Sequence, residues 1–359
     1  MALEDTAGGA VVARLPVSRE GPYPLRMSKI VVVGAGAVGG YYGGLLARAG
    51  HDVTFVMRSG LDAVRKGGLD VRSPNGDFRV AVGAVGSAAE AGIADWVICS
   101  LKATAIDEAE GLVRPAVGPE TRILALMNGL GIEERFAAWA GAERVFGGMA
   151  FVCINRGIDG VVHHLEYGRV SLGHAADDGA QLAELAALLR SGGVEVVEAP
   201  NLRYARWEKL CWNIPFNGLS VASGGLGTAT ILKDALLAAT AERAMREVVA
   251  AGNADLVEAG SASRLDGGDV VARMFGQTRT MGDYRTSMVL DYVLGRPLEV
   301  EAILGEPSRR AAALGVAVPT LDTLYALVRN ADRVRRGLQP VLRSEDVEGG
   351  DSPPPVRRE

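Results

Sequence analysis

The chain has 359 residues, with 38 Lys and Arg against 43 Asp and Glu, so its formal net charge at pH 7 is −5. Hydrophobic residues make up 48% of it, which is too much for a disordered chain. The 47 glycines follow no three-residue period, which excludes collagen, and the acidic balance offers no basic field for nucleic acid. The length favours two domains, because single cores seldom grow beyond about 250–300 residues.

Cysteine, histidine and hydropathy patterns narrow the class further. Cys99, Cys153 and Cys211 are odd in number and widely spaced, which argues against a disulfide framework and favours a reducing, cytoplasmic location. The four histidines lack the spacing of metal ligands, so no metal is predicted. No apolar run reaches the roughly 18 residues of a membrane helix, so no membrane partner is predicted.

The pattern along the chain predicts two domains between two tails. The composition predicts a disordered leader at residues 1–26 and a disordered tail at residues 337–359. Met27 is a candidate for the natural start. Residues 27–200 alternate apolar, β-branched runs with helical stretches, which predicts a parallel sheet covered by helices. Residues 201–336 carry only helical patterns. The sequence therefore predicts an α/β domain followed by an all-α domain.

The expected elements follow in chain order. The strands are expected at residues 29–34, 52–58, 94–102, 121–129, 145–154, 160–173 and 194–200. Helices are expected at residues 41–49, 181–193, 204–214, 232–260, 286–295 and 299–315.

The first expected strand runs directly into Gly34-Ala35-Gly36-Ala37-Val38-Gly39. This G-x-G-x-x-G pattern follows a buried strand, opens a helix and precedes a second strand, which is the context of a dinucleotide-binding loop. The first glycine permits the tight turn, the second lets the backbone approach the pyrophosphate, and the third lets helix and strand pack closely. A plain glycine turn is the alternative, but the context favours a Rossmann-type cofactor domain.

The end of the second expected strand bears on the choice of cofactor. Arg58 stands where NAD-binding domains usually have an acidic residue for the ribose hydroxyls. A guanidinium suits a 2′-phosphate through paired charge-assisted hydrogen bonds. NADPH is therefore the predicted cofactor, the alternative being that Arg58 is a solvated loop cation.

Two later strand ends carry polar residues. Lys102 follows the strand expected at 94–102, and Asn128 follows the one expected at 121–129. Ligands of open α/β sheets lie outside the carboxyl ends of the strands. Lys102 is therefore expected near cofactor phosphate or ribose, and Asn128 near nicotinamide or substrate. Taken alone, each residue also fits a surface loop.

The helical half has one polar stripe in apolar surroundings. Lys209, Asn213 and Asn217 recur at i, i+4 and i+8, a turn of about 40° per step, so they share one helix face. Polar groups on a buried helix are costly unless they are satisfied, which predicts a site; a solvent-facing stripe is the alternative. Pro215 is expected to kink or end the helix and to aim Asn217 differently.

From Lys29 to about Asn330 the chain resembles the ketopantoate reductases (2-dehydropantoate 2-reductases). The resemblance rests on motifs in the family's order: the glycine loop, Ser100-Leu101-Lys102, Asn128-Gly129-Leu130-Gly131, the Lys209 stripe, Thr286-Ser287-Met288 with Asp291, Gly295-Arg296-Pro297-Leu298-Glu299, and Gly315 to Pro319. It implies a Rossmann-type domain followed by an all-helical domain, as in 6-phosphogluconate dehydrogenase. It also implies NADPH-dependent reduction of ketopantoate to pantoate, as in pantothenate biosynthesis.

The resemblance implies roles for individual residues. Lys209 would donate the proton to the substrate carbonyl, with Glu299 near it and near the cofactor ribose; alone, Glu299 also fits a helix N-terminal acid. The substrate would be held by Asn128, Asn213, Asn217 and Ser287. The cofactor would contact Gly34, Ala35, Gly36, Ala37, Val38, Gly39, Arg58, Lys102, Asn128 and Glu299. Hydride attack on a 2-oxo acid builds negative charge on the ketone oxygen, which an ammonium stabilises and then protonates.

Burial would lower the pKa of Lys209 and a nearby carboxylate would raise it, and the sequence leaves that balance open. Some residues depart from the family pattern near the expected substrate pocket. Glu301 and Leu304 replace an aspartate and an asparagine, Tyr284 replaces a smaller polar residue, and residues 223–228 lack an asparagine found in some members.

These departures keep other functions open. One alternative is an enzyme of the same class that reduces a different branched or bulky 2-oxo acid. Another is a sensor that binds NADPH without catalysis. A β-hydroxyacid dehydrogenase is a further option, although those proteins usually carry Met where this chain has Val38. The predicted partner is a small-molecule 2-oxo acid, and the apolar helices of the second domain are compatible with a homodimer.

Overall fold

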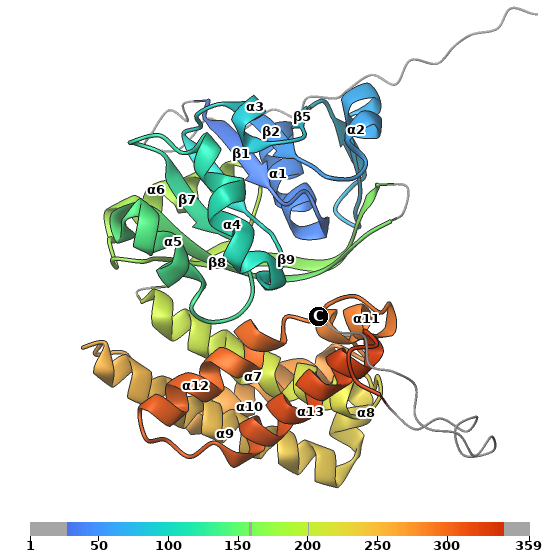
Figure 1. Cartoon of the computed structure of the whole chain (residues 1–359), viewed down its shortest axis with the longest axis vertical. Helices are drawn as coiled ribbons and strands as arrows, with labels where there is room; N and C mark the ends of the chain where they lie inside the picture. Colours follow the sequence, from blue (N-terminus) through green and yellow to red (C-terminus); the bar gives the residue numbers. More distant parts are fainter. Residues whose placement is uncertain (1–26, 158–159, 200, 341–359) are drawn as a thin grey trace, which may run out of the picture.

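The computed structural model describes residues 27–157, 160–199 and 201–340. The predicted leader and residues 341–359 of the predicted tail lie outside the described residues. An α/β domain occupies one end of the molecule and a helical domain the other, as Figure 1 shows in blue to green and in yellow to red. Strands give way to helices between β10 (Val196–Glu198) and α7 (Leu202–Ala222). This is the predicted fold class.

The α/β domain is built on a ten-stranded mixed sheet in the order β4-β3-β9-β8-β7-β6-β1-β2-β5, with β10 beside β9. Only the β3–β4 and β8–β9 pairs are antiparallel within the described chain. The other strands are β1 (Lys29–Val33), β2 (Asp52–Val56), β3 (Leu69–Arg72), β4 (Phe78–Val80), β5 (Gly83–Val85), β6 (Trp96–Cys99), β7 (Arg122–Ala125), β8 (Val145–Arg156) and β9 (Val162–His174).

The central strand β1 is buried on both faces. Ile30 and Val32 pack into one hydrophobic cluster with α1 (Ala37–Arg48) and α6 (Gly179–Ser191). Val31 and Val33 pack into a second cluster, on the opposite side of the sheet, with α4 (Ile106–Val113) and α5 (Ile132–Ala140). Successive side chains of a strand point to opposite faces, so an uninterrupted β-branched run requires helices on both sides.

The parallel pairing of β1 with β6 and of β6 with β7 brings three strand ends to one edge of the sheet. Gly34, Ser100 and Leu126 directly follow β1, β6 and β7, respectively. The edge therefore gathers the glycine loop and the two polar strand ends that the sequence singled out.

Some short elements were not predicted from the sequence. β3, β4 and β5 have only three or four residues each, too few for a clear apolar period. The two short helices α2 (Leu61–Gly67) and α3 (Ala88–Ala91) flank them.

The helical domain surrounds α7, whose residues from Asn213 to Val221 are all buried. Of the two outcomes expected at Pro215, a kink or an end of the helix, the end is excluded, because α7 continues to Ala222. Packing on all sides holds the helix through the proline. The other elements are α8 (Thr228–Lys233), α9 (Ala235–Glu258), α10 (Gly267–Thr280), α11 (Ser287–Val293), a π-helical turn (Glu301–Gly305), α12 (Glu306–Ala313) and α13 (Pro319–Arg335). Helices α10 and α13 were not predicted.

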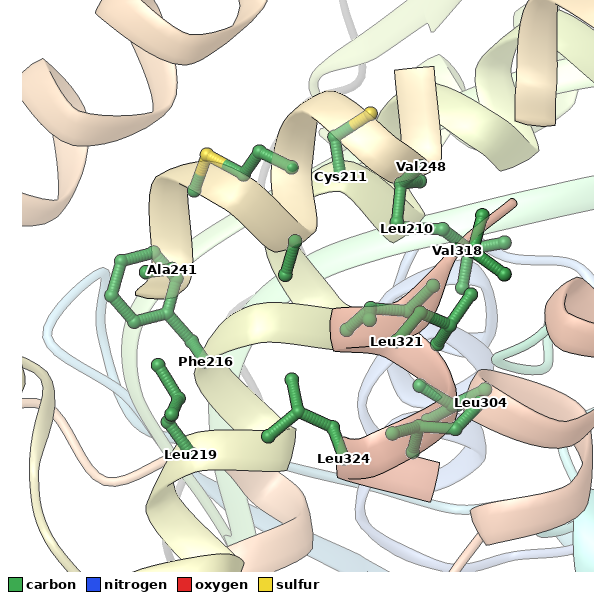
Figure 2. Packing of buried hydrophobic residues seen from close by; sticks show 14 of the residues in the cluster. Leu210, Cys211, Phe216, Leu219, Ala241, Val248, Leu304, Val318, Leu321 and Leu324 are labelled. Atoms are coloured by element: carbon green, nitrogen blue, oxygen red, sulfur yellow. The ribbon is translucent and has the colours of Figure 1, made fainter. Parts of the chain in front are cut away.

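Figure 2 shows the core of this domain, where Leu210 of α7 and Val248 of α9 lie near Val318, which precedes α13, and Leu321 of α13. This apolar contact fixes α7, and with it the polar stripe, against the rest of the domain. None of the described helices is long and apolar enough to cross a bilayer.

Candidate active site

The glycine loop packs tightly against the end of β6. Gly34 has φ +96°, and a Cβ there would lie 2.8 Å from the backbone nitrogen of Leu101. A Cβ on Gly39 would lie 2.2 Å from Ser100 Oγ. Ser100 Oγ also donates a hydrogen bond to the Gly34 carbonyl over 2.7 Å. The first and third glycines are therefore required by close contacts inside the protein.

Gly36 differs from both, because it faces open space. A Cβ on Gly36 would meet only the Gly34 carbonyl oxygen, 4.0 Å away. Helix α1 begins at the next residue, and no side chain caps it. The first N–H groups of α1 are thus left for a ligand, and a helix N-terminus favours an anion. These features fit the pyrophosphate of a dinucleotide.

A cavity of about 920 Å³ lies between the glycine loop and the helical domain. It is within the usual size range of ligand sites. Most of the predicted site residues line it: Gly34, Ala35, Gly36, Ala37, Val38, Arg58, Lys102, Asn128, Lys209, Asn213, Ser287 and Glu299. Gly39 and Asn217 are not among the lining residues.

Lys209 projects from α7 to the strand edge. Its Nζ donates to Asn128 Oδ1 over 3.0 Å and to the Ala150 carbonyl of β8 over 2.8 Å. Burial, together with the nearby Arg206 charge, lowers the pKa of Lys209 to about 7, and the opposing influence of Glu299 is smaller. The balance that the sequence left open is therefore decided by burial, which leaves a lysine able to give and take a proton near neutral pH.

Glu299 is bound from three sides. Its Oε1 accepts from the Ala103 backbone N–H over 2.8 Å, and its Oε2 accepts from Asn128 Nδ2 over 3.2 Å. The carboxylate is only 5% exposed and lies 3.9 Å from Lys102 Nζ. The Asn128 amide thus has its nitrogen on Glu299 and its oxygen on Lys209, which fixes the amide orientation.

Lys102 makes an ion pair between the domains. Its Nζ donates to Asp291 Oδ2 of α11 over 2.6 Å, while its side chain is 51% exposed. Partial burial disfavours the ammonium, but Glu299 and Asp291 outweigh it and raise the pKa of Lys102. Lys102 therefore stays charged at the mouth of the cavity, where it also links β6 to the helical domain.

A second ion pair between the domains was not predicted. Arg206, one turn before Lys209, is only 2% exposed and pairs with the buried Glu133 of α5. Its guanidinium also donates to the carbonyls of Met127, over 2.6 Å, and Ala125, over 3.3 Å. An arginine in an apolar helix was the available signal, but the sequence did not identify its partners. The pair fixes α7 beside the end of β7, where Asn128 follows.

The other two residues of the polar stripe, Asn213 and Asn217, lie in different environments. Asn213, one turn after Lys209, lines the cavity, as does Ser287 at the start of α11. Asn217 is 2% exposed, and its Oδ1 has no hydrogen-bond partner among the described residues. The Ser220 hydroxyl, one turn further on, is likewise buried and without a partner there.

Most of the departures from the family pattern lie away from the cavity. Leu304 is 0% exposed and packs in the helical core, where Figure 2 labels it. Glu301 is exposed and pairs with Arg309 and Tyr325. The expectation that both lie near the substrate pocket is therefore wrong, because the π-helical turn directs one inward to the core and the other to solvent. Of these departures, only Tyr284 lines the cavity.

Aromatic side chains line the cavity beyond Lys209. Trp212 and Tyr284 have ring centroids 6.1 Å apart, and Phe151 and Tyr167 have centroids 4.7 Å apart. All four residues belong to the cavity wall. This part of the wall is suited to an apolar or aromatic substituent.

A Rossmann-type loop, a cavity shared with a helical domain and a buried lysine define a dinucleotide-dependent oxidoreductase. Comparison with known sequences agrees. The model of the family "Ketopantoate reductase PanE/ApbA" matches residues 30–177, and that of its C-terminal domain matches residues 201–332. The 2-dehydropantoate 2-reductase of Nostoc sp. is 35% identical over 311 residues, covering 85% of this chain and 95% of that protein. The chain belongs to the ketopantoate reductase family.

Solved structures show the same arrangement. The 2-dehydropantoate 2-reductase of Geobacter metallireducens is 43% identical, with a TM-score of 0.81, covering 84% of this chain and 99% of that one. A D-mandelate dehydrogenase bound to NADH and anilino(oxo)acetate is 25% identical, with a TM-score of 0.76, covering 86% and 99% of the two chains. The solved structures that this chain is similar to therefore include proteins named for more than one substrate.

Proposed function

We propose that this protein reduces ketopantoate to pantoate with NADPH, and that Lys209 is the proton donor. The observation that carries the proposal is a lysine with a pKa near 7, held by Asn128 and the Ala150 carbonyl on the wall of a cavity that begins at a dinucleotide loop. The names of the relatives from Nostoc sp. and Geobacter metallireducens support ketopantoate as the substrate.

The cofactor, when bound, supplies the hydride. Gly36 and the start of α1 offer space and N–H groups for its pyrophosphate. Arg58 is exposed on the cavity wall and has no ion-pair partner among the described residues, so its charge is available to a 2′-phosphate. Asn128 and Lys102 would lie beside the nicotinamide half.

Lys209 would supply the charge and the proton. As negative charge develops on the substrate's ketone oxygen, the ammonium stabilises it, and transfer of the proton completes the hydroxyl group. The Asn128 oxygen and the Ala150 carbonyl hold Nζ in place without fixing its charge, because both acceptors are neutral. Glu299, one hydrogen bond beyond Asn128, favours the protonated lysine.

Polar residues on the other side of the cavity would bind the substrate. Asn213 and Ser287 line it from α7 and α11, so both can reach a carboxylate or hydroxyl group. Asn217, predicted as a third contact, does not line the cavity, so the proposed substrate contacts are Asn213 and Ser287.

A bulkier 2-oxo acid is the second candidate substrate. The observation in its favour is the aromatic wall of Trp212, Tyr284, Phe151 and Tyr167. A structurally similar D-mandelate dehydrogenase, 25% identical to this chain, was solved with anilino(oxo)acetate. Leu304, which raised this alternative, does not support it, because it lies in the core.

The test is NADPH oxidation by the purified protein with ketopantoate and with a panel of aliphatic and aromatic 2-oxo acids. The main proposal expects the highest kcat/KM for ketopantoate, with pantoate identified as the product. A higher kcat/KM for an aromatic 2-oxo acid would replace ketopantoate by that class. NADPH binding without oxidation by any member of the panel would favour a sensor.

A further inference from the structure

Arg156 contacts the glycine loop although its strand, β8, lies three positions from β1 in the sheet. It is the last residue of β8, and its Nη1 donates to the carbonyl oxygen of Ala35. Its Nε donates to the Gly160 carbonyl over 3.3 Å. The side chain lines the same cavity as the loop. The β8–β9 hairpin therefore carries a guanidinium to the cofactor site.

The charge of Arg156 is not neutralised within the described part of the chain. Both of its hydrogen-bond acceptors are backbone carbonyls, and no carboxylate forms an ion pair with it there. By contrast, Arg273 and Arg285, which also line the cavity, pair with Glu208 and Asp283. A half-buried guanidinium without a counter-ion is costly, and an anionic ligand would relieve that cost.

Burial lowers the pKa of Arg156 from its ordinary value, which is consistent with this environment. The guanidinium nevertheless keeps its charge at every physiological pH, because arginine titrates far above neutrality. Of its five N–H donors, two are engaged by backbone carbonyls. The remaining donors are available for a ligand.

The position of Arg156 indicates which phosphate it would meet. A Cβ on Gly60 would lie 3.2 Å from Arg156 Nη2, and Gly60 follows Arg58 by two residues at the end of β2. In this fold the end of the second strand reads the adenosine ribose, whereas the pyrophosphate lies on the first helix. Arg156 lies between the loop and the end of β2, which is the ribose side.

We propose that Arg156 is a second phosphate-binding residue, which together with Arg58 holds the 2′-phosphate of NADPH. Arg156 ends β8 and Arg58 follows β2 by two residues, and both line the cavity. Paired charge-assisted hydrogen bonds of this kind give both affinity and discrimination. The choice between NADPH and NADH would then depend on Arg156 of the β8–β9 hairpin as well as on Arg58, which the sequence pattern identifies. The inference rests on the proposed use of NADPH.

The test measures dissociation constants of NADPH, NADH and 2′,5′-ADP by calorimetry, so it does not depend on turnover. Arg156→Ala should weaken NADPH and 2′,5′-ADP by roughly tenfold or more and NADH by less than about threefold. Arg156→Lys keeps the positive charge, so its affinity for NADPH should lie between those of the wild type and of Arg156→Ala. Arg79→Ala is the matched control, because Arg79 is an exposed arginine on β4 that pairs with Asp70 and does not line the cavity.

Two outcomes would overturn the assignment. Equal weakening of NADPH and NADH would place Arg156 at the pyrophosphate or make it only a support for the loop, and unchanged NADPH affinity would remove it from the site. Retained NADH binding also shows that the variant is folded. A different result would contradict the proposed use of NADPH: the wild-type protein would bind NADH as tightly as NADPH.

Discussion

Lys209 and Glu299 are joined by a single amide, that of Asn128. The lysine donates to the Asn128 oxygen over 3.0 Å, and the carboxylate accepts from the Asn128 nitrogen over 3.2 Å. The lysine comes from α7, the asparagine from the end of β7, and the glutamate from the loop after α11. The proposed proton donor therefore feels the charge of a carboxylate that does not bind it directly.

Lys209→Ala should lower kcat by roughly 10²- to 10⁴-fold while leaving NADPH affinity close to that of the wild type. The reason is that the variant loses the ammonium that would stabilise and protonate the ketone oxygen, whereas the glycine loop is untouched. Single-turnover NADPH oxidation measures the first effect and calorimetry the second. Wild-type turnover in this variant would exclude the acid role.

Glu299→Gln should shift the alkaline limb of the kcat/KM profile to lower pH. Activity needs protonated Lys209, so kcat/KM is expected to fall as pH rises above about 7. Glutamine keeps an oxygen for Ala103 and removes the negative charge that favours the ammonium. Profiles of both proteins with the same 2-oxo acid measure the shift, and a limb that moves to higher pH would contradict the account.

The Arg206–Glu133 pair should affect both stability and pH dependence. Arg206→Met leaves a buried carboxylate unpaired, which should cost roughly 3–5 kcal/mol of unfolding free energy. Adding Glu133→Leu should restore part of that loss. Because Arg206 depresses the pKa of Lys209, the double variant should move the alkaline limb to higher pH. Urea unfolding and kcat/KM profiles measure the two effects, and an unmoved limb would show that Arg206 is only structural.

Lys209 should also make the unfolding free energy depend on pH. Its pKa is about 7 in the folded protein and 10.5 ordinarily, so between these values the unfolded chain binds more protons. The stability associated with this group therefore falls as the pH drops from about 10 to 7. Lys209→Met has no amine to titrate. Its free energy of unfolding relative to the wild type should therefore rise as the pH drops from about 10 to 7. Urea unfolding at pH 7 and pH 9.5 measures it, and a constant difference would contradict the depressed pKa.

In the glycine loop, Gly39→Ala should lower the stability of the protein, whereas Gly36→Ala should lower its affinity for the cofactor. Gly39→Ala places a Cβ 2.2 Å from Ser100 Oγ and should destabilise the fold by roughly 1–3 kcal/mol. Gly36 has φ −74°, which alanine tolerates, and its Cβ would project into open space. Gly36→Ala should therefore keep the melting temperature and lose cofactor affinity. Equal stability losses in both variants would show that Gly36 has a structural role instead.

Arg58→Ala should weaken NADPH more than NADH, because Arg58 stands at the end of β2 with no ion-pair partner in the described chain. The ratio of the two dissociation constants measures this. An unchanged ratio would show that Arg58 does not bind the 2′-phosphate.

The local part of the site could be predicted from the sequence. The glycine loop, β1 and β2 follow one another, so one stretch of sequence contains both the motif and its context. Lys209 and Asn213 share a helix face, and the cavity lies on that face. Such features depend only on strand and helix periods, which a sequence displays directly.

The contacts between distant elements could not be predicted. Arg206 and Glu133 are 73 residues apart, and Lys102 and Asp291 are 189 apart, so no local period relates them. Leu304 was misplaced for a related reason: the π-helical turn changes the direction of its side chain, and the sequence does not show that turn. Arg156 was missed because it is 121 residues from Ala35, which it contacts, so no local period relates the two.

The most direct test of the central claim is the pH dependence of kcat/KM for ketopantoate with saturating NADPH, measured for the wild type and for Lys209→Ala, with the product identified. Pantoate is expected as the product, and the wild-type profile should fall on the alkaline side. Lys209→Ala should have activity lower by roughly 10²-fold or more and no such limb. The same alkaline limb at full activity in Lys209→Ala would contradict the central claim.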